Sequence, residues 1–274
     1  MRGSAWETNF EKDFENADQS VDEIIKLVGG LKSLGSIWRY FWKLLKLLFN
    51  SKRELIDMCH FGQLDDQLDR QLLELILSLL IRSPHTRASL ETFSIIDTVE
   101  AKEEIGKANM QSQFRSAKRA LDRGHLSNHI YIFLVSQTKE FIFADGMLNS
   151  LTPSLVGSGL HGHALVPLTP NLCVYICTPT SMRSDINYGS LAVAPWIVDM
   201  ANEITQIYAG KEIYFRKGKS KINPDFFDGD FKTIKYGKHN LFDHLNTLTG
   251  YGSQFRNLDG KLEYRQSWMK HFRD

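Results

Sequence analysis

The feature of this sequence that most constrains its fold is a change in the spacing of apolar residues near Asn128. Before this point apolar residues recur at helical spacing, and after it they form short β-branched or aromatic runs, of which Ile130–Val135 (IYIFLV) is the first. A period of about 3.6 residues is typical of helices, whereas short apolar runs bounded by turn residues are typical of strands. The sequence therefore predicts an α+β fold in which an N-terminal helical region packs on a small antiparallel β-sheet.

Most of the first region, residues 1–124, is predicted to be helical. The expected helices are Asn9–Val28, Ser36–Asn50, Leu64–Ile81, Thr86–Ile105 and Met110–Arg123. The helix over residues 64–81 is apolar on one face at its start and almost all round further on, which is typical of a central helix. Gly29-Gly30, Ser83-Pro84 and Gly124 are stop signals that support these bounds.

The second region, residues 125–216, is predicted to form one domain with the helices and to contain two β-hairpins. The expected strand pairs are Ile130–Val135 with Phe141–Phe143, and His163–Leu168 with Leu172–Cys177. The second pair turns at Thr169-Pro170-Asn171. Pro167 has no backbone N–H to donate, so we expect its strand at an edge of the sheet.

One C-terminal amphipathic helix, Leu191–Tyr208, and a short strand, Glu212–Arg216, are predicted to complete this region. Pro195 near the start of the helix and Gly210 after its end fit these bounds. Residues 217–274 are polar and rich in glycine and aspartate, and we expect them to form an irregular C-terminal extension. Its apolar residues, Leu241 and Leu245 among them, indicate that part of the extension packs against the domain.

The composition favours a globular protein in a reducing compartment. The formal net charge of +1 gives no overall attraction to nucleic acid or to an acidic membrane, so any such binding must be local. The cysteines are odd in number and lack disulfide or zinc-site spacing, and Cys173 and Cys177 are interpreted as core residues. Because the first residues lack the pattern of a secretory signal, we expect a cytoplasmic protein.

The most apolar segment, Ser36–Asn50, raises the question of membrane contact. Its cations fall on one helical stripe, and a helix of about fifteen residues rising ~1.5 Å each is shorter than the ~30 Å hydrocarbon core. Two interpretations stay open, a helix buried on most faces and an interfacial helix lying on a membrane. The buried helix is favoured because the flanks are not polybasic. Within this segment, Ile37–Phe49 is the candidate surface for a protein partner.

Asp145 is the first candidate functional residue because it ends the apolar run in EFIFADGML. A carboxylate at a strand end lies at the rim of a sheet, where a metal ligand or a base is commonly needed. The alternative is a turn residue whose side chain caps the loop at Gly146. Arg82 and Arg87 flank a helix break in IRSPHTR, and their guanidinium groups suit phosphate or carboxylate. The alternative for Arg82 is a solvated cation at the end of a helix.

The candidate metal ligands are Asp145, His161 and His163, which would hold a divalent cation. The two histidines share a face of an extended segment, LHGH, although two histidines rarely bind a metal without a third ligand. The sequence contains no phosphate-binding loop, dinucleotide fingerprint, nucleophile elbow or metalloprotease helix.

Taken in order, IRSPHTR, FIFADG, LVPLTPNLCVYI and ANEITQIYAGKEIYF resemble a family of uncharacterised, mostly bacterial proteins, the domain of unknown function forty-two thirty-eight. That family typically shows an Arg-small-Pro-x-x-Arg segment, a strand ending in Phe-Ile-x-Ser-Asp, and a strand written Pro-Leu-Ser-Pro. The likeness spans about Glu11 to Arg216. It implies that Arg82, Arg87, Asp145 and Asn202 are matching polar positions, and we expect them to converge at one rim of the sheet.

The chain departs from the family pattern in two places. Nothing before Glu11 matches the opening His-His-x-x-Pro segment, and Asp145 is followed by Gly146-Met147-Leu148 where the family has Asn-Pro. If the missing histidines are catalytic in the family, this chain is either inactive or uses others, such as His161, His163 or His239.

Two classes of function therefore stay open. In the first, the protein is a hydrolase-like effector that acts on nucleic acid or nucleotide in a bacterial defence or toxin system. Arg82 and Arg87 then hold phosphate, Asp145 is a metal ligand or base, and Asn202 orients the substrate. In the second, the protein is a non-catalytic partner-binding module that has lost the opening histidines, with Ile37–Phe49 and the C-terminal extension as its interaction surface.

Overall fold

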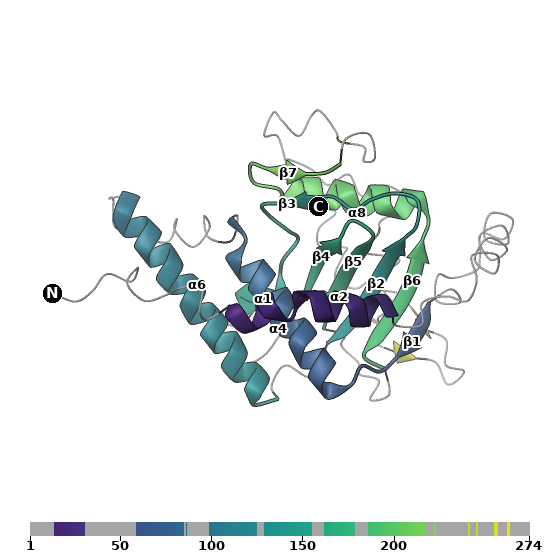
Figure 1. Ribbon diagram of the computed structural model, residues 1–274, viewed down its shortest axis with the longest axis horizontal. Helices are drawn as coiled ribbons and strands as arrows, with labels where there is room; N and C mark the ends of the chain where they lie inside the picture. The colour runs from purple at the N-terminus through teal and green to yellow at the C-terminus, as the bar shows by residue number, and fades with distance from the viewer. Residues whose placement is uncertain are drawn as a thin grey trace, which may run out of the picture.

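The computed structural model describes residues 14–30, 59–84, 86, 99–124, 129–154, 162–178 and 186–216, together with residues 222, 241, 245, 255–256 and 262–263. Within these residues, a five-stranded sheet lies between helices that pack on its two faces (Figure 1). The mixed α+β class predicted from the sequence is therefore confirmed.

The main sheet has the strand order β1-β6-β2-β5-β4. Its strands are β1 (His60–Gly62), β2 (Ile130–Ser136), β4 (His163–Thr169), β5 (Leu172–Cys177) and β6 (Tyr188–Val193). The pair β2–β6 is parallel, and the pairs β1–β6, β2–β5 and β4–β5 are antiparallel. The prediction of a purely antiparallel sheet is wrong, because β6 returns beside β2 and runs in the same direction.

Strand β6 is absent from the sequence-based prediction, which assigns Leu191 onward to a helix. The helix α8 (Pro195–Tyr208) begins after the strand, with proline in the first turn, where its missing N–H costs nothing. Gly189 lies in β6 where neighbouring chains approach closely, since a Cβ there would lie 2.6 Å from Cys59 Sγ and 2.8 Å from Ile132 Cδ1. Glycine has little preference for strands, which makes β6 hard to predict, but at position 189 the neighbouring side chains leave no room for a Cβ.

The predicted hairpin of β4 and β5 is confirmed, with Val166 opposite Val174. Strand β4 is at one edge of the sheet, as the proline at position 167 indicates, and the pairing register shifts between Pro167 and Thr169. The prolyl residue therefore lies where its missing donor interrupts the ladder least.

The other predicted hairpin is wrong. Strand β3 (Phe143–Ala144) does not pair with β2 but forms a separate two-stranded sheet with β7 (Ile213–Tyr214). Both edges of β2 are already occupied by β5 and β6, so the chain after β2 leaves the main sheet. The predicted strand near residues 212–216 is confirmed as β7.

One face of the sheet is covered by helices from the first region. These are α1 (Glu15–Gln19), α2 (Val21–Gly30), α4 (Asp66–Arg82) and α6 (Val99–Asp122). The carboxylate of Asp65 accepts a hydrogen bond from the backbone N–H of Leu68 at 2.9 Å and so caps the start of α4. The helix ends at Arg82, before Ser83-Pro84, as predicted.

Helix α6 is one continuous helix where the sequence predicts two. The chain stays helical through Gly106, although glycine is a weak helix former. Gly124 ends it as predicted: its φ is 70°, and its N–H donates to the carbonyl of Leu121 at 3.0 Å.

The opposite face of the sheet is covered by α8 (Figure 1). Alternate residues of β2 separate the two cores: Tyr131 and Phe133 pack with the first-region helices, whereas Ile132 and Leu134 pack with α8. The short helix α7 (Leu151–Ser154) precedes β4, and Leu151 packs in the core of the first-region helices.

The C-terminal extension contributes to the core beneath α8. Leu241 and Leu245 are each 1% exposed and pack in the same cluster as Val198. The prediction that these leucines pack is confirmed, and two short strands, β8 (Phe255–Arg256) and β9 (Leu262–Glu263), pair further on.

The candidate partner helix, residues 37–49, lies outside the described residues. No helix within the described residues is both long and apolar enough to cross a membrane.

We expect Leu245→Ala to lower the free energy of unfolding by about 2–5 kcal/mol, the range for truncating a buried leucine. Urea denaturation followed by circular dichroism measures this. Leu27→Ala is the matched control, because Leu27 on α2 is 44% exposed, and we expect a change within about 0.5 kcal/mol. Equally small effects of the two substitutions would contradict packing of the extension in the core.

Candidate functional site

Asp145 follows β3, and both of its carboxylate oxygens accept backbone hydrogen bonds. Oδ1 accepts from the N–H of Gly210 at 2.7 Å, and Oδ2 accepts from the N–H of Lys211 at 2.8 Å. The N–H of Asp145 itself donates to the carbonyl of Glu212 at 3.1 Å. The side chain therefore closes the turn between α8 and β7, 65 residues further along the chain, and so caps a different turn from the Gly146 loop considered in the sequence.

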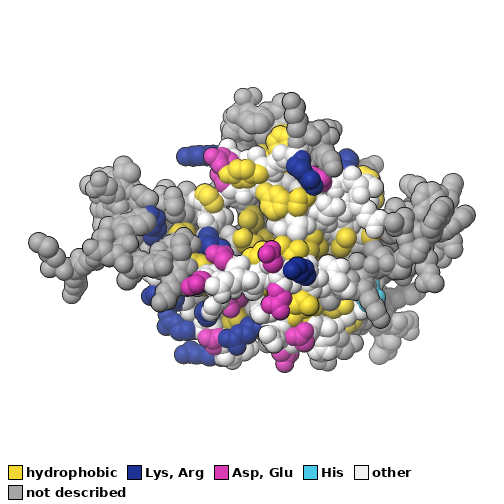
Figure 2. Space-filling model, in the orientation of Figure 1, with side chains coloured by type: hydrophobic (Ala, Val, Ile, Leu, Met, Phe, Trp, Pro, Cys, Tyr) yellow, Lys and Arg dark blue, Asp and Glu magenta, His cyan; other side chains and the backbone are white. Residues whose placement is uncertain are grey.

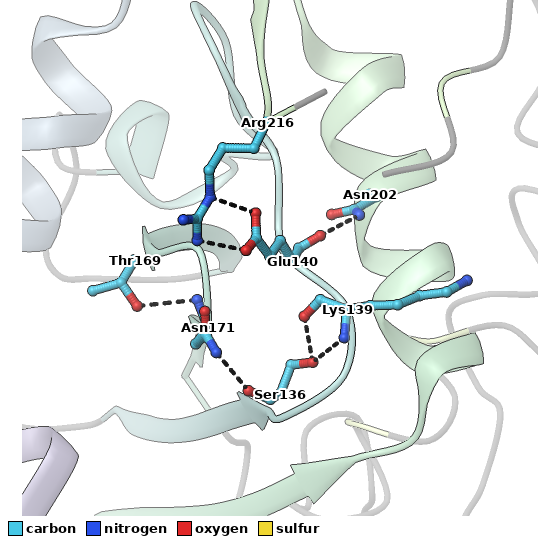
Figure 3. A network of polar contacts seen from close by, with 7 residues as sticks. All are labelled: Ser136, Lys139, Glu140, Thr169, Asn171, Asn202 and Arg216. Atoms are coloured by element: carbon cyan, nitrogen blue, oxygen red, sulfur yellow. Dashed lines mark hydrogen bonds and ion pairs between the residues drawn. The ribbon is translucent and has the colours of Figure 1, made fainter. Parts of the chain in front are cut away.

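Asn202 on α8 joins the helix to the chain between β2 and β3 (Figure 3). Its Oδ1 accepts from the N–H of Ile142 at 3.0 Å, and its Nδ2 donates to the carbonyl of Glu140 at 2.9 Å. The residue is 2% exposed. Because the segment it contacts is not in the main sheet, Asn202 supplies the partners that this backbone would otherwise lack.

Glu140 and Arg216 form a second link beside Asn202 (Figure 3). Arg216 Nε donates to Glu140 Oε2 at 2.8 Å, and a second guanidinium nitrogen contacts Oε1. The glutamate side chain is 9% exposed and the arginine side chain 63%. A carboxylate buried to this degree needs a charged partner, so Arg216 holds the end of β7 against the loop after β2.

The remaining contacts in Figure 3 shape the turn after β2. Ser136 Oγ donates to the carbonyl of Lys139 at 2.5 Å, and Asn171 Nδ2 donates to the carbonyl of Ser136 at 3.1 Å. The ammonium group of Lys139 contacts the carboxylate of Asp199 on α8. This turn is therefore attached to both the β4–β5 hairpin and α8.

Arg82 lies among the first-region helices, on the other face of the sheet from α8. Its guanidinium makes a two-pronged contact with the carboxylate of Asp18, with NH1 to Oδ2 at 2.9 Å, and its Cζ lies 4.9 Å from the centre of the Phe14 ring. The structure thus brings Asp145 and Asn202 into the α8 layer and gives Arg82 a partner in α1. Arg87 lies outside the described residues.

His163 begins β4 and is the one candidate metal-ligating histidine whose position is described. Its ring lies 6.0 Å from that of Tyr175, and burial lowers its pKa to about 4. His161 and His239 are outside the described residues. Among the residues with described positions, no three His, Cys, Asp or Glu side chains gather where they could hold a metal ion. A metal role for Asp145, His161 and His163 therefore stays a prediction from the sequence.

Glu140, Arg216, Asp18 and Asp199 are the polar partners that sequence reasoning missed. Glu140 pairs with a residue 76 positions away, and Arg82 with one 64 positions away. Such pairs leave no local pattern, because each charge alone is typical of a loop or a helix surface.

No family model, curated protein or solved structure matches this chain. The resemblance to the domain of unknown function forty-two thirty-eight therefore rests on its sequence motifs and stays a prediction.

We expect Asn202→Ala to lower the free energy of unfolding by about 2–4 kcal/mol, because the Ile142 N–H and the Glu140 carbonyl lose their buried partner. Equilibrium unfolding in urea measures the loss. Glu203→Ala is the control, since Glu203 is the exposed neighbour on the same helix. A loss no larger for Asn202→Ala than for Glu203→Ala would show that the two amide bonds do not hold α8 in place.

Acidification should destabilise the protein in part through His163. Its folded pKa of about 4 lies below the ordinary value of 6.5, so the neutral ring contributes stability above about pH 6.5 that is lost as the pH falls toward 4. The wild type minus His163→Gln difference in unfolding free energy should therefore decrease by up to about 3 kcal/mol over this range. Urea titrations at several pH values measure it, and a difference independent of pH would contradict the burial of the ring.

Proposed function

We propose that this protein is a non-catalytic partner-binding module. The observation that supports this proposal is that the side chains of Asp145 and Asn202 form hydrogen bonds within the fold. The hydrogen-bonding atoms of both side chains are directed at the protein's own backbone, where they connect α8, β7 and the loop after β2.

A general base or metal ligand must present its oxygen to a substrate or ion. Each Asp145 oxygen already accepts a backbone hydrogen bond at 2.7–2.8 Å, and Asn202 is 2% exposed. Similarly, the Arg82 guanidinium faces the Asp18 carboxylate, which occupies the place that a phosphate would take. These contacts account for the candidate residues without any reaction.

The competing proposal is the hydrolase-like effector acting on nucleic acid or nucleotide. It draws on Arg87, His161 and His239, whose positions lie outside the described residues. It stays a prediction from the sequence, and the geometry around Asp145 and Asn202 favours the binding module over it.

A reducing, cytoplasmic location is part of the same proposal. Cys173 and Cys177 are buried in the core as predicted, and the cysteines are free thiols. Burial raises the pKa of Cys59 to about 12, so this thiol stays protonated and unreactive near neutral pH.

The test compares the growth of a bacterial host that expresses wild type or Asp145→Asn at equal soluble levels. Asn keeps the shape of the side chain but removes its charge. For a binding module we expect Asp145→Asn to change growth only as far as it lowers the folded fraction, and Leu245→Ala gives the comparator for a loss of stability alone. Arrest by wild type, with none by an equally folded Asp145→Asn, would overturn the module and support the effector.

A further inference from the structure

Two leucines of the C-terminal extension, Leu241 and Leu245, lie in the apolar core on the face of the sheet that α8 covers. Each is 1% exposed, and each has helical backbone. Residues four apart lie on one face of a helix, so the two side chains enter the core as a pair. We call the apolar position that they fill, between α8 and the sheet residues of the same cluster, the leucine site.

The leucine site exists because α8 is narrower than the sheet. Strands lie about 4.8 Å apart, so five strands span about 19 Å, whereas one helix with its side chains is about 10–12 Å wide. Buried side chains of β2, β4, β5 and β6 all face this side. Within the described residues, this face is covered by α8, by Phe141 and Leu148, and by the two leucines of the extension. Leu241 and Leu245 therefore cover apolar surface that a single helix does not reach.

The sequence around the pair is typical of a helix that docks through one apolar face. Leu241, Leu245 and Leu248 have the i, i+4, i+7 spacing of helices that bind in apolar grooves of other proteins. Asn240 is a favoured N-cap residue before this run, and Gly250 is a stop signal after it. The run therefore carries its own start and stop signals, as an independent helical peptide would.

A polar stretch of sequence joins this run to the rest of the protein. Residues 217–240 number 24 and include six lysines, three aspartates and three glycines. A composition of this kind is typical of linkers. A linker of such length holds its end at an effective concentration of about a millimolar, which a tightly binding partner can outcompete.

The surface of the α8 layer is also apolar. Trp196 on α8, and Tyr214 and Phe215 at the end of β7, are 45%, 54% and 47% exposed. Figure 2 shows hydrophobic side chains, in yellow, at the surface in the upper part of the view, where Figure 1 places α8 and β7. Aromatic side chains are enriched at protein interfaces, so this layer suits contact with a protein.

We propose that the leucine site is a docking site for an amphipathic helix of a partner protein, with apolar anchors four residues apart, and that Leu241 and Leu245 occupy it as the chain's own competing ligand. This inference rests on the binding-module function and names its partner class. A partner helix replaces the two leucines with equivalent side chains, so the apolar face of the sheet stays covered in both states.

The first test is binding of a fluorescently labelled synthetic peptide of residues 236–250, which stands in for the partner helix. Anisotropy compares its affinity for the full-length wild type and for full-length Leu241→Asp/Leu245→Asp, whose own anchors are removed. We expect the double variant to bind the peptide at least about tenfold more tightly, because the wild-type chain competes for its own site. Equal affinities, or no binding to either chain, would overturn the proposal.

The controls locate the peptide and establish what holds it. The same peptide with both leucines replaced by aspartate should not bind, and Leu27→Asp, at an exposed position on α2, should leave the chain with wild-type affinity. A nitroxide on the peptide should broaden the NMR amide signals of α8 and leave those of α6 sharp. Binding that ignores the leucines, or broadening away from α8, contradicts the leucine site.

Urea denaturation tests whether the pair is displaceable. One aspartate is enough to release a docked segment, so Leu245→Asp and the double variant should lose the same unfolding free energy. Two aspartates in an obligatory core would instead have separate costs. A double variant that is much less stable than the single one, or that does not fold, would show that the leucines are fixed core residues and would overturn the proposal.

Two further outcomes separate this proposal from its alternatives. A wild-type dimer that disappears in Leu241→Asp/Leu245→Asp, measured by light scattering over a range of concentrations, would replace the partner helix with the extension of a second copy. Growth arrest that depends on the Asp145 carboxylate at equal folded levels would refute the module whether or not the peptide binds. Failure of peptide binding alone would leave the module without this partner class.

Discussion

Burial of strand β2 on both faces is the constraint on which the rest of the structure depends. Tyr131 and Phe133 point to one side and Ile132 and Leu134 to the other, and all four are at most 1% exposed. A strand of this kind is stable only between two apolar layers, since each large side chain gains about 1.5–3 kcal/mol from burial. The helices of the first region supply one layer, and α8 with Leu241 and Leu245 supplies the other.

Because α8 covers the second face, the backbone N–H and C=O groups buried beside it need hydrogen-bond partners within the protein. The chain between β2 and β3 leaves the main sheet, and its buried residues 140–142 lie against α8 through Asn202. Asn202 and the Glu140–Arg216 pair provide the hydrogen bonds and the charge balance that this segment needs, and Asp145 closes the neighbouring turn between α8 and β7. The polar residues that look functional in the sequence therefore solve a structural problem created by the apolar strand beside them.

Local signals in the sequence were sufficient for the elements whose bounds depend on neighbouring residues. The end of α4 at Ser83-Pro84, the left-handed Gly124 and the β4–β5 hairpin all follow from backbone chemistry within a few residues. The parallel pairing of β6 with β2 does not, because it joins two segments far apart in the chain and because Gly189-Ser190 has little strand preference. The same limit applies to the candidate site: the sequence places Asp145 at a strand end, but its partners at 210 and 211 leave no local pattern.

The distribution of charge separates two kinds of polar residue in this protein. Those in the α8 layer are paired within the fold, so replacing them changes stability first. The arginines of α6 lie on the outer face of a helix whose core contacts are made by other residues, so replacing them leaves those contacts intact.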